Sequence, residues 1–269
     1  MKTGFIGGGN MAEALIKGVV SRGKLTSPVQ KEIFVSEPRE ERRKYLEKTY
    51  GTKTTSSNKE VASSCNIIIL AVKPQNMEGV LDEISPDITE EKTVVSIAAG
   101  ITLSFLQSKL KTKKLVRVMP NTPALVQEGM SVMSLCECFS DKDITVVREI
   151  FMSIGKVTTL PEKYMDAVTA LSGSGPAFIA LFIEEMIRAG IKLGLSEDDA
   201  FTLAVQTAIG TAKLLETGMT PSKLREMVTS PGGTTAAGLN VFKDNGLTDI
   251  VSAALTAAKN RAEELGRKE

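Results

Sequence analysis

The residues best suited to chemistry in this chain of 269 residues are three consecutive glycines near its start, Gly7, Gly8 and Gly9. They follow the apolar residues 4–6, which are typical of a buried strand, and precede apolar residues at helical spacing. With Ala12 they fit G-x-G-x-x-G/A, in which Gly7 allows a tight turn and Gly9 lets the backbone approach a pyrophosphate. The free amides of the following helix would face that anion. We therefore expect a bound dinucleotide; the alternative is a glycine turn that binds nothing.

The chain contains no histidine, which excludes a Ser-His-Asp triad, a Cys-His pair and every histidine-ligated metal site. Its three cysteines, Cys65, Cys136 and Cys138, are too few and too irregularly spaced for a disulfide framework or a zinc site. Cys65 is expected to be a small core residue, and no metal site is expected. Any reaction must then rely on a cofactor, backbone amides, hydroxyls, carboxylates or lysines.

The second expected strand, residues 32–36, leads into the positions that contact the adenosine ribose in a dinucleotide-binding fold. An acidic residue there binds the 2′-hydroxyl of NAD, whereas a serine or an arginine can bind the 2′-phosphate of NADP. Ser36, Glu37 and Arg39 are all present, so the local pattern is mixed. We expect NADPH to be preferred, with Ser36 and Arg39 on the phosphate and Glu37 turned to solvent. Alternatively, Glu37 favours NAD and Arg39 is a solvated residue at the start of the charged helix 39–49.

The elements that position these residues alternate between strand and helix. Continuous apolar runs such as residues 66–72 suit parallel strands covered on both faces, and the alternation predicts a Rossmann-type doubly wound, mostly parallel sheet over residues 1–161. Lys73 lies at a strand end that should line the cofactor crevice, so we expect it to contact the cofactor rather than only solvent. The other strands are expected at residues 93–98, 115–119, 130–135 and 156–160, with a helix over 141–153.

Strand-like runs disappear after about residue 161, and residues 162–269 are expected to be all-helical. The helix expected over 177–193 is apolar almost all round, and such a helix is buried on every side. We therefore expect a substrate-binding and dimerisation domain that forms an intertwined homodimer. Two irregular stretches, 172–176 and 230–235, are expected to place free amides at helix N-termini, where a carboxylate can bind. The alternative is a pair of glycine-rich caps.

These motifs together resemble the pyrroline-5-carboxylate reductase family, from residue 4 to about residue 265. The resemblance implies reduction of the cyclic imine L-1-pyrroline-5-carboxylate to L-proline, the last step of proline synthesis, with NADPH or NADH. It also implies decamers built from dimers. The motifs are Gly4-Phe-Ile-Gly-Gly-Gly-Asn-Met-Ala, Ala71-Val-Lys-Pro, Met119-Pro-Asn-Thr-Pro, Leu171-Ser-Gly-Ser-Gly-Pro-Ala and the family signature Ser230-Pro-Gly-Gly-Thr-Thr-Ala-Ala-Gly.

The resemblance also implies roles for single residues. Family members mostly lack an acid after Ser36, so Glu37 leaves the choice between NADPH and NADH open. Substrate contacts are implied, largely across the dimer interface, for Glu162, Ser230, Gly233, Thr234 and Thr235. Cofactor contacts are implied for Ile6, Gly7, Gly8, Gly9, Asn10, Met11, Ser36, Pro38, Asn58, Ala71, Val72, Lys73, Pro74 and Ala99.

The residues are consistent with a simple mechanism for this reaction. The cofactor supplies the hydride, and the protein supplies proximity and placement of charge. Amides near Thr234 and Thr235 would hold the substrate carboxylate, and the Thr235 hydroxyl would hydrogen-bond the ring nitrogen. An imine protonated from solvent needs no histidine, and no dedicated acid is identifiable.

Two other functions remain as alternatives for this sequence. A β-hydroxyacid dehydrogenase would need a catalytic lysine on the apolar helix, and residues 177–186 contain none. A non-enzymatic dinucleotide-sensing protein would have no use for two polar small-residue loops. A net charge of +1 argues against nucleic-acid binding, and no apolar run approaches the roughly 20 residues that span a bilayer. With no signal peptide recognised, we expect a cytoplasmic protein.

Overall fold

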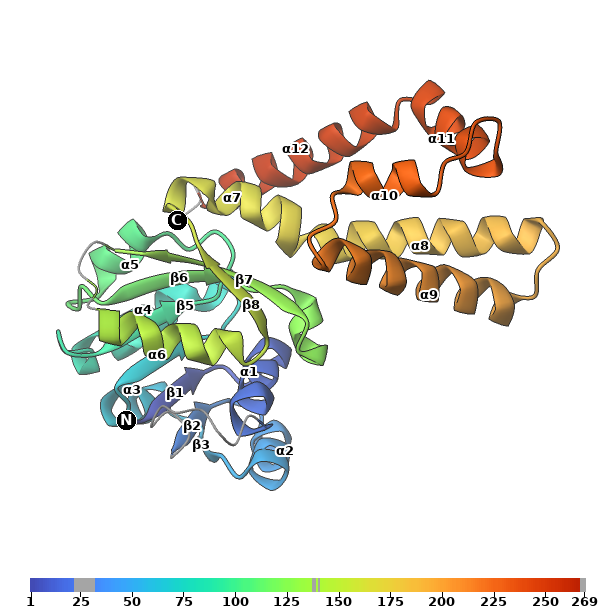
Figure 1. Cartoon of the computed structure of the whole chain (residues 1–269). Coiled ribbons are helices and arrows are strands. Elements are labelled where there is room, and N and C mark those ends of the chain that lie inside the picture. The colour runs from blue at the N-terminus through green and yellow to red at the C-terminus, as the bar shows by residue number, and fades with distance from the viewer. Residues whose placement is uncertain (22–31, 137–138, 140, 267–269) are drawn as a thin grey trace. The chain divides into compact units, whose positions relative to one another are not determined.

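The computed structural model describes residues 1–21, 32–136, 139 and 141–266 (Figure 1). The chain divides into two compact units, Met1–Ser174 together with Ala258–Glu269, and Gly175–Ala257. This division differs from the boundary expected at residue 161, because Met165 and Val168 still pack in a small cluster with Val132 of the sheet. Residues 162–174 therefore belong structurally to the first unit.

One sheet of eight strands organises the first unit, in the order β3-β2-β1-β4-β5-β6-β7-β8. Neighbouring strands are parallel except for the antiparallel pair β6 and β7, which confirms the mostly parallel doubly wound sheet. The order of the first six strands is that of dinucleotide-binding folds. The short edge strand β3 was not expected, because its Lys-Thr-Thr sequence has no apolar run. The strands are β1 (Thr3–Ile6), β2 (Ile33–Ser36), β3 (Lys53–Thr55), β4 (Ile67–Leu70), β5 (Thr93–Ser96), β6 (Leu115–Met119), β7 (Gly129–Leu135) and β8 (Gly155–Thr159).

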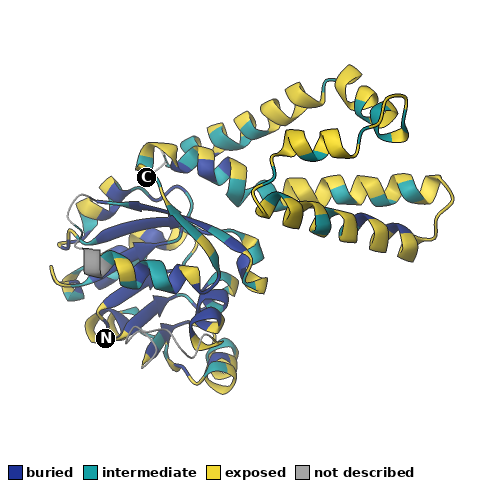
Figure 2. Ribbon diagram, viewed as in Figure 1, coloured by how far each residue is buried: buried dark blue, intermediate teal, exposed yellow. Residues whose placement is uncertain are grey.

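The hydrophobic core forms two clusters on this sheet, and most of its strands are buried (dark blue in Figure 2). Phe5 of β1 packs in one cluster with residues of α1 and α6, whereas its neighbour Ile6 packs in a second cluster with residues of α3, α4 and α5. Successive strand residues point to opposite faces, so β1, β2, β4, β5 and β6 each place side chains in both clusters. Cys65 and Cys136 are free and buried, as expected for Cys65, and Cys138 lies outside the described residues. The helices are α1 (Asn10–Ser21), α2 (Glu40–Tyr50), α3 (Asn58–Ser64), α4 (Met77–Ile84), α5 (Leu103–Lys109), α6 (Asp141–Met152) and α7 (Met165–Val168).

The second unit is helical, as predicted. The Ser196 hydroxyl accepts a hydrogen bond from the Asp199 amide at the start of α9, and Thr220 caps α10 in the same way ahead of Pro221. Few of its residues are buried, Ala200 and Ala204 of α9 among them. Its helices are α8 (Gly175–Lys192), α9 (Glu197–Glu216), α10 (Pro221–Met227), α11 (Thr234–Asp244) and α12 (Leu247–Gly266), of which α12 continues into the first unit.

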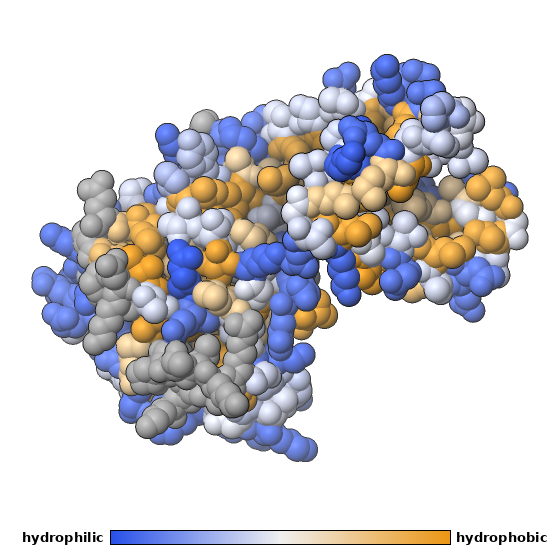
Figure 3. Space-filling view, viewed as in Figure 1, coloured by the Kyte–Doolittle hydropathy of each residue, from blue (hydrophilic) through white to orange (hydrophobic). Residues whose placement is uncertain are grey.

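The apolar helix α8 is largely exposed in the single chain. Ile179 and Leu181 are 62% and 56% exposed, and hydrophobic side chains reach the surface over the helices of this unit (Figure 3). Its C-terminal half is more polar than expected, because Arg188 pairs with Glu184 and Glu185. An apolar surface of this extent is typical of an interaction site.

By length and composition, the helical stretch Glu162–Lys192 could cross a membrane. The expectation that no segment is long enough was wrong on this point, because it considered only uninterrupted apolar residues. Helices that bury apolar surface against other parts of a protein can have the same length and composition, so one such helix is weak evidence for a membrane span.

Candidate active site

The glycine turn after β1 has the geometry that a pyrophosphate-binding loop needs. Gly7 has a φ of +97°, and a Cβ on it would lie 2.6 Å from the carbonyl oxygen of Ala71, so no other residue fits without a shift. A Cβ on Gly9, in contrast, would have no atom within 4 Å. Gly7 therefore serves the turn itself, and Gly9 leaves open space beside the first amides of α1, which include those of Asn10 and Met11. The residues present fit a dinucleotide.

The strand ends place the other expected cofactor residues at the same edge of the sheet. Ile6 is in register with Ser36 on one side and with Leu70 on the other. The Ala71 amide donates to the carbonyl of Ile6 at 2.8 Å, which extends the pairing by one residue. Ala71, Val72, Lys73 and Pro74 thus follow β4 beside the glycine turn, with Lys73 exposed, and Ala99 follows the adjacent strand β5.

Ser36 and Asn58, both expected to contact the cofactor, contact each other. The Ser36 hydroxyl donates to Oδ1 of Asn58 at 2.7 Å, and Ser36 is only 1% exposed. Asn58 donates through its Nδ2 to the Glu83 carboxylate at 2.7 Å. The Ser36 hydroxyl already has a protein partner, so its contact with a 2′-phosphate stays a prediction.

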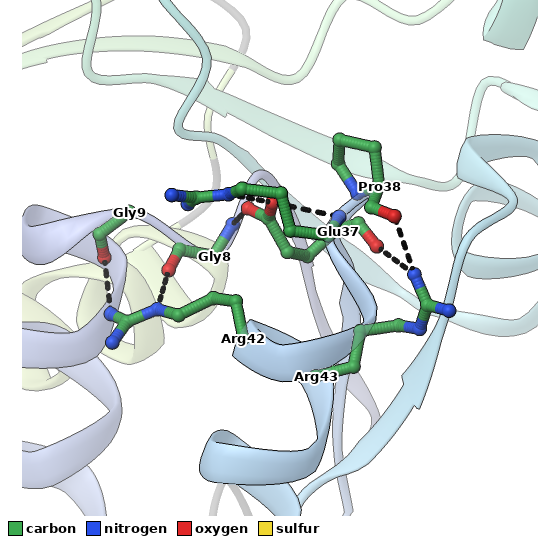
Figure 4. Close-up of polar contacts among 7 residues, drawn as sticks. Gly8, Gly9, Glu37, Pro38, Arg42 and Arg43 are labelled. Atoms are coloured by element: carbon green, nitrogen blue, oxygen red, sulfur yellow. Dashed lines mark hydrogen bonds and ion pairs between the residues drawn. The ribbon is translucent and has the colours of Figure 1, made fainter.

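Glu37 contradicts the expectation that its side chain turns to solvent, because it is 4% exposed and lies against the glycine turn (Figure 4). Its Oε2 accepts a hydrogen bond from the Gly8 amide at 3.0 Å. Its Oε1 accepts from the backbone amide and from Nε of Arg39, at 3.2 and 2.7 Å. Burial raises the pKa of Glu37, but these hydrogen bonds outweigh it and the net pKa is lowered. The carboxylate is drawn inward because the turn and Arg39 offer donors that compensate its burial.

Arg39 and Pro38 lie at the surface beside this carboxylate. The Arg39 side chain is 67% exposed, and its guanidinium bonds Glu37 through one nitrogen. Arg43 donates to the carbonyl oxygens of Glu37 and Pro38, at 2.7 and 2.8 Å. The contact of Arg39 with a 2′-phosphate stays a prediction.

The sequence did not identify Arg42 and Glu13 as part of this site. Arg42 donates through Nε to the carbonyl of Gly8 at 2.7 Å and forms an ion pair with Glu13 at 2.5 Å. Glu13 also accepts hydrogen bonds from the hydroxyls of Tyr45 and Tyr50, at 2.9 and 2.8 Å. The turn is thus held from both sides, Gly8 donating to Glu37 and accepting from Arg42. The basic residues that follow β2 were the only signal, and they resemble any solvated helix face.

Glu162, expected to contact substrate, has protein partners in the first unit. Its Oε1 accepts from the Leu103 amide at the start of α5 at 2.8 Å and pairs with Arg117 at 3.2 Å. Arg117 is 5% exposed and also pairs with Asp166 at 3.6 Å. These contacts anchor Glu162, and its role toward substrate stays a prediction.

The loop before α11 has the predicted arrangement within the second unit. Gly233 is the N-cap of α11, and Thr234 and Thr235 are its first two residues. A Cβ on Gly233 would lie 2.4 Å from the Ser230 hydroxyl, so this hydroxyl lies directly over the glycine. The cap residue has no side chain, so the first amides of the helix lack a side-chain cap. The structure therefore brings Ser230, Gly233, Thr234 and Thr235 together at one helix start.

The other expected loop, residues 172–176, is not a loop. Residues Thr169–Gly173 form a π-helical turn that leads into α8, with the Ser174 amide donating to the carbonyl of Thr169 at 2.8 Å. The expected loop was wrong because small hydroxyl residues are typical of a helix cap, whereas the Ser172 hydroxyl donates back to the carbonyl of Val168 within the helical turn. Pro176 has no N–H, and the Ser172 carbonyl accepts instead from Asn121 Nδ2 at 3.1 Å. π-Turns of this kind are frequent at functional sites.

Comparison with known proteins identifies relatives along the whole chain. Residues 162–265 match the family model for pyrroline-5-carboxylate reductase dimerisation, and residues 2–100 match that for NADP oxidoreductase, coenzyme F420-dependent. The chain is 40% identical to pyrroline-5-carboxylate reductase of Synechocystis, over 100% of this chain and 99% of that one. Among the described residues, no group of three His, Cys, Asp or Glu side chains could hold a metal ion.

Solved structures agree with this similarity. Plasmodium falciparum pyrroline carboxylate reductase with NADP bound superposes with a TM-score of 0.86 at 35% identity, covering 99% of this chain and 98% of that one. A pyrroline-5-carboxylate reductase from Coxiella burnetii superposes with a TM-score of 0.90 at 34% identity, covering 98% and 97%.

Proposed function

This chain belongs to the pyrroline-5-carboxylate reductase family, and we propose that it reduces L-1-pyrroline-5-carboxylate to L-proline, the last step of proline synthesis. The hydride donor is NADPH, with NADH as an alternative. The observation that carries this proposal is the similarity to such enzymes from end to end, at 40% identity to the Synechocystis protein. The open space at Gly9 supports the cofactor, since it gives a pyrophosphate access to the backbone.

The chain's own residues position the reactants. When bound, the reduced nicotinamide supplies the hydride for the imine carbon. The glycine turn binds the pyrophosphate with backbone amides, and the residues after β4 and β5 line the same edge. The amides of Thr234 and Thr235 hold the substrate carboxylate, because a helix N-terminus favours an anion. The Thr235 hydroxyl hydrogen-bonds the ring nitrogen, and Glu162, Ser230 and Gly233 complete the contacts with substrate.

The chain forms a homo-oligomer through its dimerisation domain, for which we propose residues 162–269 and an intertwined dimer. The exposed apolar face of α8 supports this, because a second chain would remove it from water. The family resemblance implies decamers built from dimers, and we propose this assembly here. We further propose that the protein is cytoplasmic and binds no membrane. We also propose that it binds no nucleic acid, because its net charge of +1 lacks the basic excess that such binding needs.

Loss of reduced-nicotinamide absorbance tests the function. Purified protein should oxidise NADPH only when pyrroline-5-carboxylate is added. No turnover with either cofactor would contradict the proposal. Oxidation of β-hydroxy acids would instead support the dehydrogenase alternative, and tight dinucleotide binding without any turnover would support a sensing protein.

A further inference from the structure

We propose that Glu37 narrows the preference for NADPH over NADH, because its carboxylate disfavours the 2′-phosphate of NADPH relative to the free ribose hydroxyl of NADH. This inference rests on the proposed function in that it names the cofactor preference of the same site. It replaces the expectation that Glu37 points away from the ligand.

The position of Glu37 supports this role. It follows the last residue of β2, which is in register with the last residue of β1, and its carboxylate reaches the Gly8 amide at 3.0 Å. A Cβ on Gly8 would lie 3.3 Å from Glu37 Oε2 and 3.2 Å from Glu37 Cβ, so the carboxylate is packed directly on the turn. In a dinucleotide-binding fold, an acid at this place contacts the adenosine ribose.

The hydrogen bonds of the carboxylate leave room for one more donor. An ionised carboxylate only accepts, and its two oxygens offer about four sites. Oε1 accepts twice from Arg39, and Oε2 accepts from Gly8. A ribose 2′-hydroxyl can donate to the remaining site of Oε2. A dianionic phosphate in its place has no proton to donate and is repelled by the same charge.

Arg39 does not remove this repulsion in full. Its Nε is bound to Glu37 Oε1 at 2.7 Å, so its positive charge is largely balanced by that carboxylate. Removing the negative charge should release the guanidinium for a phosphate. Glu37→Gln therefore acts twice in favour of NADPH, by ending a repulsion and by freeing a cation.

The test is calorimetric titration of the full-length protein with NADP⁺ and with NAD⁺, without imine. For Glu37→Gln, we expect the ratio of the NADP⁺ to the NAD⁺ dissociation constant to fall by about tenfold or more, which corresponds to about 1.4 kcal/mol. Glu40→Gln is the matched control, because it removes an equal charge from a carboxylate that is exposed and paired with Lys44. It should change the ratio by less than about twofold.

The ratio is insensitive to a general weakening of the turn, which would affect both dinucleotides alike. Glu37→Ser, which removes charge and size together, should shift the ratio in the same direction. An unchanged ratio in both Glu37 variants, or an equal shift in Glu40→Gln, would overturn the inference. These titrations contain no imine. If they show the expected change in the ratio but the protein has no catalytic turnover, only the proposed function is contradicted.

Discussion

Two alanine substitutions in the glycine turn should separate folding from binding. At Gly7, alanine must adopt a φ of +97° and place its Cβ 2.6 Å from the Ala71 carbonyl oxygen. The left-handed backbone costs about 1–2 kcal/mol and the overlap about 1–3 kcal/mol more, so Gly7→Ala should lose about 2–5 kcal/mol of unfolding free energy. At Gly9, the Cβ meets no atom within 4 Å, so Gly9→Ala should fold normally.

The same Gly9→Ala change should impair the cofactor site. Its methyl group projects into the open space through which we expect a pyrophosphate to approach the backbone. A steric conflict of about 1–3 kcal/mol corresponds to a dissociation constant for NADPH that rises roughly 5- to 150-fold. The free energy of unfolding of this variant should equal that of the wild type or be slightly higher, because alanine reduces the conformational freedom of the unfolded chain.

Denaturant unfolding and fluorescence titration with NADPH, performed on both variants, provide the measurements. We expect Gly7→Ala to be less stable and Gly9→Ala to be stable but weak in binding. Normal NADPH affinity in a well-folded Gly9→Ala protein would refute the assignment of this turn to the pyrophosphate. Wild-type stability of Gly7→Ala would refute the geometry of the turn itself.

Three further outcomes follow from the structure. Thr235→Val should lower kcat/KM about 5- to 150-fold, since the ring nitrogen loses a hydrogen-bond partner worth about 1–3 kcal/mol. The affinity for NADPH should stay within about twofold of the wild type. An unchanged kcat/KM would show that Thr235 does not contact the substrate. Phe182→Glu should yield insoluble or inactive protein, because it places an unpaired charge in the core of the proposed dimer. Sedimentation of the wild type should show no monomer, and a soluble, active monomeric variant would disprove the intertwined dimer. Burial raises the pKa of Glu13, but hydrogen bonds from Arg42, Tyr50 and Tyr45 outweigh it and leave the pKa below the ordinary 4.5. The ionised Glu13 therefore stabilises the folded protein fully above pH 4.5, and this stabilisation is lost as pH falls through the lowered pKa. Glu13→Gln should therefore reduce the decline of the melting temperature below that pH, and an equal decline in both proteins would contradict this.

The sequence alone determined the features that depend on local pattern. The run from Ile67 to Leu70 became a central parallel strand, and the glycine turn lies between a strand and a helix, because periodicity and backbone freedom act over a few neighbouring residues. Ser196 and Thr220 cap their helices for the same reason. The family resemblance added the expected reaction and the residues expected in each site.

The tertiary structure alone decided which way the charged and polar side chains point. Glu37 turns inward because the Gly8 amide, 29 positions away in the chain, offers it a hydrogen bond. Arg117 and Glu162, separated by 45 positions, meet only when β6 and the segment after β8 are folded together. Residues 172–176 lead from a π-helical turn into α8, and the Ser172 carbonyl accepts a hydrogen bond from Asn121, which lies in the loop after β6. A charge or an amide in a buried place is stabilised by partners that are remote in sequence, so its orientation cannot be inferred from its neighbours.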